Sequence, residues 1–130
     1  MRGLLDTSVF IASETGRRLD EDRIPEETAL SVVTLAELQA GVLAAADVGI
    51  RARRMATLAA CSDIAVVEVD EAAALMWAHM RVHLAQSGRR CNVNDLWIAA
   101  SAASRGWAVV TQDDDFGSVD GVGGLRVVRV

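Results

Sequence analysis

Four acidic residues occur at positions where a parallel sheet would bring them together. Asp6 and Asp113 each follow a short apolar run, and Glu37 and Asp95 lie near the starts of predicted helices. In an open parallel sheet, strand ends and the following helix starts meet at the crevice beyond the carboxyl ends of the strands, which is the usual ligand site. Four carboxylates facing one crevice repel one another, so this arrangement predicts a bound cation.

Each of these acids also has an ordinary structural interpretation. Asp6 can cap a helix, Glu37 can form a capping box with Thr34, Asp95 can interact with a helix dipole, and Asp113 can belong to a turn. The combination of all four favours a metal site. Oxygen ligands without Cys or a convincing His indicate Mg²⁺ or Mn²⁺, which activates water and stabilises the leaving oxygen in phosphodiester hydrolysis.

The segment VTQDDDF, Val110 to Phe116, places three carboxylates side by side. Side chains alternate along an extended segment, so Asp113 and Asp115 are expected to face the site together. Asp114 is then expected to point into solvent.

Short apolar runs alternate with longer helical patterns, which predicts an α/β fold with a parallel sheet in a single domain, residues 1–130. The predicted strands are Gly3–Leu5, Leu30–Val33, Ile64–Val69, Ala108–Val110 and Leu125–Val130. The predicted helices are Thr34–Ala46, Ile50–Ala60, Asn94–Arg105 and a segment that begins at Asp70 and stops near Gly88. The Met76, Met80 and Leu84 stripe of the last helix is expected in the core or on a partner surface.

The amino-acid composition excludes several classes of protein. The net charge is −5, and all 13 basic residues are arginine, which removes chemistry that requires a lysine ammonium group. Cys61 and Cys91 are too far apart in sequence to suggest a zinc ribbon or a disulfide framework. No apolar run is long enough to span a membrane, and the N-terminus does not resemble a signal peptide, so we expect a cytoplasmic protein.

Four segments, in this order, resemble the PIN domain family and, within it, the VapC ribonuclease toxins of bacterial toxin–antitoxin pairs. They are LLDTS from Leu4, TLAEL from Thr34, NDLWIAA from Asn94 and VTQDDDF from Val110. The resemblance spans nearly the whole chain. It implies a three-layer fold with a central parallel sheet flanked by helices, and metal-dependent cleavage of single-stranded or looped RNA.

The resemblance also implies roles for individual residues. The catalytic acids would be Asp6, Glu37, Asp95 and Asp113, and the metal ligands Asp6, Asp95, Asp113 and Asp115. Supporting neighbours would be Thr7, Ser8, Asn94 and Thr111.

A nuclease with a negative net charge needs basic contacts for its substrate. Arg89 and Arg90 precede Asp95 closely, and we expect them to contact RNA. Trp97 could stack on a base or pack in the core. His79 and His83 lie four residues apart, and we expect them to form an exposed surface pair because they lack the acidic pattern of a metalloprotease helix.

The resemblance implies a VapB-like antitoxin as inhibitory partner, and a homodimer is common in the family. The stripe of Met76, Met80 and Leu84 and the helix face of Leu35 to Val42 are candidates for the antitoxin groove.

Three alternatives remain at this level. A phosphatase or phospho-receiver domain also clusters aspartates, but it normally holds phosphate with a lysine. A PIN nuclease with a housekeeping role would share every acidic residue. A PIN domain that only binds would be expected to lack one or more of them.

Overall fold

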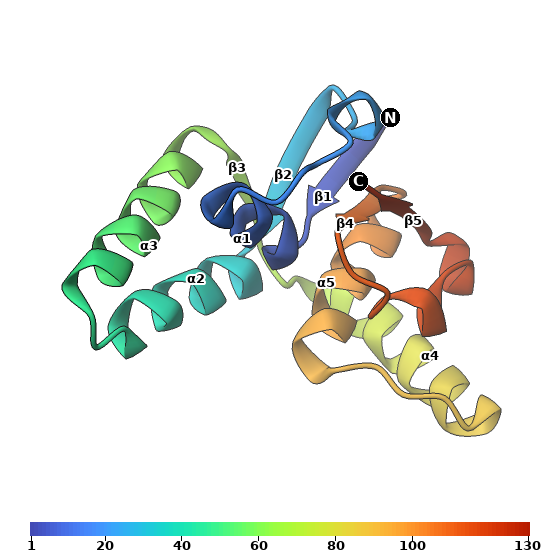
Figure 1. The fold of residues 1–130 in the computed structure, drawn as a ribbon. Helices are drawn as coiled ribbons and strands as arrows, with labels where there is room; N and C mark the ends of the chain where they lie inside the picture. The colour runs from blue at the N-terminus through green and yellow to red at the C-terminus, as the bar shows by residue number, and fades with distance from the viewer.

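The computed structural model describes all 130 residues and forms a five-stranded parallel sheet (Figure 1). The strands are β1 (Arg2–Leu5), β2 (Glu27–Ser31), β3 (Ala65–Val67), β4 (Ala108–Thr111) and β5 (Arg126–Arg129). Their order is β3-β2-β1-β4-β5, and every neighbouring pair is parallel. After β1, the chain adds β2 and β3 on one side of β1 and then adds β4 and β5 on the other side. The point where the strand order reverses therefore lies between β1 and β4, where ligand crevices form in such sheets.

Five α-helices surround the sheet. They are α1 (Thr7–Thr15), α2 (Val32–Ala44), α3 (Val48–Ala60), α4 (Glu71–Ser87) and α5 (Val93–Ser104), and four short 3₁₀ turns complete the chain. The predicted limits of α4 are confirmed: the Asp70 side chain accepts a hydrogen bond from the Ala73 amide, and Gly88 ends the helix with φ 67°. None of the helices is long and apolar enough to cross a membrane.

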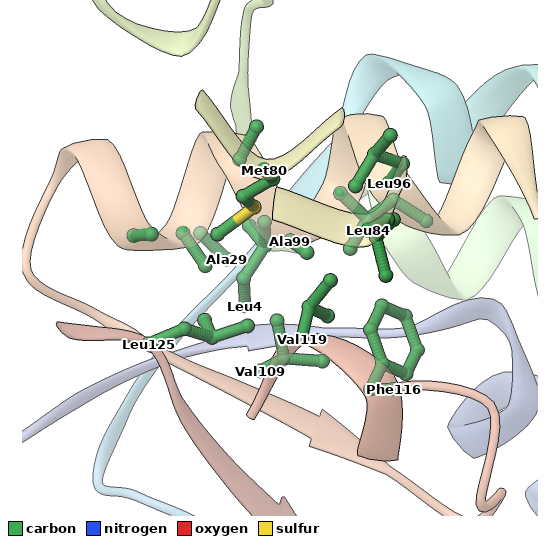
Figure 2. Close-up of a cluster of buried hydrophobic side chains, with 14 residues drawn as sticks. Leu4, Ala29, Met80, Leu84, Leu96, Ala99, Val109, Phe116, Val119 and Leu125 are labelled. Carbon is green, nitrogen blue, oxygen red and sulfur yellow. The ribbon is translucent and has the colours of Figure 1, made fainter. Parts of the chain in front are cut away.

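The central strands β1 and β4 are buried on both faces over most of their length, which explains their apolar sequence, whereas the edge strands β3 and β5 are partly exposed. Successive residues of a strand point to opposite faces. Leu4 and Val109 lie in the large cluster against α4 and α5 (Figure 2). Leu5 and Val110 instead pack with Val9 of α1. Helices therefore cover both faces, and the predicted three-layer α/β fold is confirmed.

Helix α5 lies deep in the molecule and is rich in small residues. Seven of its 12 residues are buried: Leu96, Ile98, Ala99, Ala100, Ser101, Ala102 and Ala103. Small side chains allow α5 to approach both the sheet and α4 closely, and Phe116 and Val119 fill the space beside it (Figure 2). This burial holds the first turn of α5, which contains Asp95, in a defined position.

The start of α2 differs from the prediction. The helix begins at Val32, and Ser31 is its cap, because the Ser31 hydroxyl accepts a hydrogen bond of 3.0 Å from the Val33 amide. The predicted strand Leu30–Val33 is therefore wrong in its second half, and the capping box of Thr34 and Glu37 does not form. Glu37 is released from that structural role and lies in the second turn of the helix.

The apolar stripe of α4 belongs to the core. Met80 is fully buried and Leu84 is 2% exposed, so these two side chains pack in the core and offer little apolar surface to a partner. Leu38 and Val42 of α2 are buried as well. The exposed large apolar side chains near the α2–α3 connection are Leu43, Val48, Ile50 and Met55.

Candidate active site

A crevice of about 310 Å³ gathers five carboxylates at the carboxyl edge of the sheet. They come from four separate parts of the chain: Asp6 follows β1, Glu37 belongs to α2, Asp95 to α5, and Asp113 and Asp115 to the turn after β4. The sequence predicted this convergence from strand ends and helix starts. The remaining lining residues are Thr7, Ser8, Ile11, Arg17 and Asn92.

Asp6 is the most enclosed of these acids, with 4% of its surface exposed. Its backbone N–H donates to the Val110 carbonyl at 2.8 Å, which ties the end of β1 to β4. Its Oδ2 atom caps α1 by accepting from the Ser8 amide at 3.3 Å, and it also accepts from the Thr111 hydroxyl at 3.1 Å. The capping interpretation of Asp6 is correct, and it is compatible with a place in the crevice.

Three hydroxyl groups connect the acids to the scaffold. Thr7 Oγ1 donates to Glu37 Oε1 at 2.8 Å and so holds α2 against α1. Because the Thr111 proton is directed to Asp6, Thr111 accepts from Ser8 at 3.1 Å and from the Asp113 amide at 3.0 Å. These contacts of Thr7, Ser8 and Thr111 orient Asp6, Glu37 and the start of the acidic turn.

The electrostatics of the crevice favour a cation. The pKa of Asp95 is raised from 3.8 to about 7, first by burial and then by the charges of Asp6, Asp115, Glu37 and Asp113, in that order of importance. A divalent ion would remove this repulsion, because an opposite charge favours the ionised carboxylate.

The pKa of Asp113 is raised as well. Burial raises its pKa, the neighbouring charges of Asp115 and Asp6 add to the effect, and the cations of Arg17 and Arg129 oppose it. Two acids in one crevice therefore retain protons more strongly than free carboxyl groups do.

The donor set fits Mg²⁺ or Mn²⁺, since five carboxylates and several hydroxyls offer only oxygen. No group of three or more Asp, Glu, His or Cys side chains is arranged to enclose an ion as the chain stands. An ion with two or three protein ligands and several waters is the usual Mg²⁺ coordination in phosphate enzymes. The crevice therefore fits a partly hydrated ion that substrate oxygens can reach.

The three adjacent aspartates have different surroundings. Asp113 and Asp115 line the crevice, whereas Asp114 is exposed and forms an ion pair with Arg129 of β5. The predicted grouping is confirmed, but its basis was wrong, because β4 ends at Thr111 and the aspartates lie in bends and turns rather than in an extended segment. Arg129 also donates to the Gln112 carbonyl at 2.8 Å and so anchors this turn to β5.

Two residues in the crevice were missed by sequence reasoning. Asn92 caps α5 and lines the crevice, whereas the predicted neighbour Asn94 is exposed and does not. Arg17 follows Gly16, which ends α1 with φ 75°, and the Arg17 amide donates to the Ala12 carbonyl at 2.8 Å. The Gly16-Arg17 pair is a helix stop signal that could have indicated this position.

Arg89 and Arg90 lie outside the acidic crevice. Both line a separate hollow of about 550 Å³ between the end of α4 and the start of α5. Trp97 is stacked on Trp77 with ring centroids 4.9 Å apart and an interplanar angle of 16°, so one of its faces is covered from within the chain. His79 and His83 are exposed, in agreement with the predicted surface pair.

Comparison with known proteins adds to this geometry. The PIN domain model matches residues 3–122. The chain is 59% identical to Ribonuclease VapC5 of Mycobacterium tuberculosis over 128 residues, which cover 98% of this chain and 95% of the relative. It is 41% identical to Ribonuclease VapC4 of the same species, with 93% of each chain covered. The crystal structure of the toxin–antitoxin pair VapBC-5 from Mycobacterium tuberculosis contains a similar chain, with TM-score 0.94, 56% identity, and coverage of 99% of this chain and 98% of that one.

Proposed function

The chain belongs to the PIN domain family, and on that premise we propose that it is a metal-dependent endoribonuclease of the VapC type. It hydrolyses phosphodiester bonds in single-stranded or looped RNA and acts as a toxin that a VapB-like antitoxin neutralises. The names of the relatives, Ribonuclease VapC5 and Ribonuclease VapC4, support the ribonuclease activity. The similarity to a chain of the VapBC-5 complex supports the antitoxin partner.

The structural observation that most supports this function is the convergence of five carboxylates on one crevice. A bound divalent cation would offset that density of negative charge, and the pKa of Asp95, raised to about 7 by burial and by the neighbouring carboxylates, reflects the cost of leaving the crevice without one. Lysine-dependent phosphate chemistry has no basis, because the chain contains no lysine.

We propose that the divalent ion, Mg²⁺ or Mn²⁺, binds among Asp6, Asp95, Asp113 and Asp115, directly to two or three of them and through water to the rest. When bound, the ion supplies an activated water and neutralises charge on the leaving oxygen. Asp6 is held by Thr111 and Ser8, so its carboxylate is already oriented.

We propose that Glu37, which accepts a hydrogen bond from Thr7, takes a proton from the attacking water. Arg17 is the one cation that lines the crevice and can contact a substrate phosphate.

The oligomeric state and the cellular location of the chain are proposals that do not depend on the acidic site. We propose that the chain forms a homodimer, a property common in the family, and that its place of action is the cytoplasm. Size-exclusion chromatography with light scattering of the antitoxin-free chain tests the dimer, and a monomer at micromolar concentration would contradict it.

RNA cleavage tests the proposed function directly. The antitoxin-free protein should cut an RNA hairpin within its loop in Mg²⁺ or Mn²⁺ and leave a 5′-phosphate. Chelator should stop the cleavage, and Asp95→Asn should abolish it. Cleavage that persists in chelator, or that is unchanged in Asp95→Asn, would refute the metal mechanism.

A housekeeping nuclease remains the second candidate, because every acidic residue would serve it equally well. Expression of the chain with and without the neighbouring reading frame separates the two. A toxin slows growth only when it is expressed alone, whereas equal growth in both cultures would favour the housekeeping role. Sequencing the 5′ ends of RNA after induction would then identify the cleaved site.

A further inference from the structure

A second hollow, distinct from the acidic crevice, lies where α4 ends and α5 begins. Its volume is about 550 Å³. Trp77, Arg81, Leu84 and Ala85 line it from α4 at spacings of three and four residues, which places them on one helix face. Gly88 then ends the helix with φ 67°, and the chain turns so that Arg89 and Arg90 also line the hollow.

The charge of this hollow is opposite to that of the crevice. Arg81, Arg89 and Arg90 line it, and no acidic residue does. None of the three guanidinium groups takes part in an ion pair; only Arg89 has a polar contact, with the Gly117 carbonyl at 3.3 Å. In a chain of net charge −5, three unpaired arginines beside an apolar wall form a local site for an anion.

The apolar wall of the hollow includes an aromatic ring. Trp77 lines it and is stacked against Trp97 on one side, which holds the indole plane in place. A flat aromatic ring with neighbouring guanidinium groups is suited to a nucleotide, which combines an aromatic base with an anionic phosphate.

A third hollow, of about 600 Å³, connects the two sites. It shares Arg90 and Cys91 with the arginine-lined hollow, and it shares Asn92, Asp95 and Asp115 with the acidic crevice. The buried hydroxyl of Ser118, which also lines it, has no partner. The arginine-lined hollow and the acidic crevice therefore adjoin through this third hollow, which Asp114 also lines.

We propose that the hollow lined by Trp77, Arg81, Arg89 and Arg90 binds a nucleotide of the RNA strand that lies beside the scissile bond. The proposal rests on the ribonuclease function and adds a substrate subsite to it. An acidic peptide could also meet three arginines, but the continuity with the crevice favours a polymer that occupies both sites at once. The arginines would bind the phosphate, and Trp77 would contact the base.

The salt dependence of RNA binding tests the subsite. A fluorescein-labelled RNA hairpin with a long loop is titrated with the antitoxin-free Asp6→Asn chain, which is expected to bind without cutting. Adding Arg81→Gln or Arg90→Gln should weaken binding several-fold and reduce the slope of log Kd against log salt by about 0.7, the value for one phosphate of a single strand. Arg53→Gln is the matched control, because Arg53 is an exposed arginine of α3, outside all three hollows.

A second pair of variants tests the base contact. Trp77→Phe keeps a flat ring and should retain binding, whereas Trp77→Leu should weaken it about fivefold or more, since stacking on an aromatic side chain has a comparable effect elsewhere. Circular dichroism shows whether both variants fold. Equal RNA affinity for the two folded variants would contradict the role of Trp77.

The outcomes separate this inference from the ribonuclease function. If the wild-type chain cuts the hairpin in Mn²⁺ and the arginine variants bind like Arg53→Gln, the subsite is wrong and the function stands. If those variants weaken binding of the antitoxin alone, the hollow belongs to a protein partner and the proposal fails. If the wild-type chain neither binds nor cuts RNA, both proposals fail.

Discussion

The hydroxyl of Thr111 donates a hydrogen bond of 3.1 Å to the carboxylate of Asp6, although 105 residues separate them in sequence. Thr111 is the last residue of β4 and fully buried, and Asp6 directly follows β1. This contact joins two strand ends at the point where the strand order reverses. One side chain thereby orients a proposed metal ligand and the turn that contains Asp113.

Replacement of Thr111 by valine tests that contact. Valine keeps the shape but leaves Asp6 without one donor and the Asp113 amide without its acceptor. We expect a loss of about 1–3 kcal/mol in the free energy of unfolding, typical of buried polar groups left unpaired. RNA cleavage should fall strongly. Thr111→Ser keeps the hydroxyl and should retain most of the stability and most of the cleavage activity. Equal activity of the valine and serine variants would contradict the orienting role.

The three adjacent aspartates should differ in their effect on activity. Asp113→Asn removes a crevice carboxylate and should reduce cleavage by orders of magnitude. Asp114→Asn removes an exposed partner of Arg129 that lines the neighbouring hollow but not the acidic crevice, and such surface pairs contribute about 0–1 kcal/mol. Cleavage rates of the two variants, measured side by side, test this division. A similar loss in both would mean that the turn acts as one unit.

Stability without metal should depend on pH in a defined direction. The pKa of Asp95 is raised from 3.8 to about 7, mainly by burial and then by neighbouring carboxylates. Between those values the folded chain keeps a proton that the unfolded chain has lost, so stability falls as pH rises. Thermal unfolding in chelator should therefore show a midpoint that decreases from about pH 4 to about pH 7.

Asp95→Asn serves as the control for the pH dependence. The variant removes the titrating group, so its midpoint should fall less over the same range and exceed that of the wild type at neutral pH. Added Mn²⁺ should raise the midpoint of the wild type at neutral pH. An unchanged slope in Asp95→Asn would show that other groups cause the pH dependence.

Arg17 should contribute to substrate binding. Its place in the crevice depends on the left-handed turn at Gly16, and its cation lowers the pKa of Asp113. Arg17→Gln should raise KM for RNA more than it lowers kcat, because the contact is made with a ground-state phosphate as well. Arg18→Gln is the matched neighbour outside the crevice, and an equal effect of both variants would contradict a specific contact.

Much of the fold was predictable because its signals are local. The alternation of apolar runs and helical patterns predicted the parallel sheet, and Asp70 and Gly88 predicted the limits of α4. The start of α2 was misassigned because Val32 and Val33 continue an apolar run that resembles a strand. Only the Ser31 hydroxyl, which caps the helix, marks the true boundary.

The acidic part of the site was predictable for a different reason. Strand ends and helix starts converge by topology alone, so Asp6, Asp95 and Asp113 could be grouped without coordinates. The arginine that lines the crevice could not be found this way, because proximity in sequence to Asp95 drew attention to Arg89 and Arg90, which line a neighbouring hollow. The turn after α1 instead places Arg17 in the crevice, and such long-range placement depends on tertiary packing rather than on spacing.

Calorimetric titration of Mn²⁺ into the antitoxin-free chain tests the central claim, that the carboxylate crevice is a divalent metal site, most directly. The account predicts saturable binding in the wild type and in Asp114→Asn, and binding that is weakened at least tenfold in Asp95→Asn, roughly 1.4 kcal/mol or more. Equal Mn²⁺ affinity in all three chains, or no saturable binding by a chain that still cuts RNA, would contradict it.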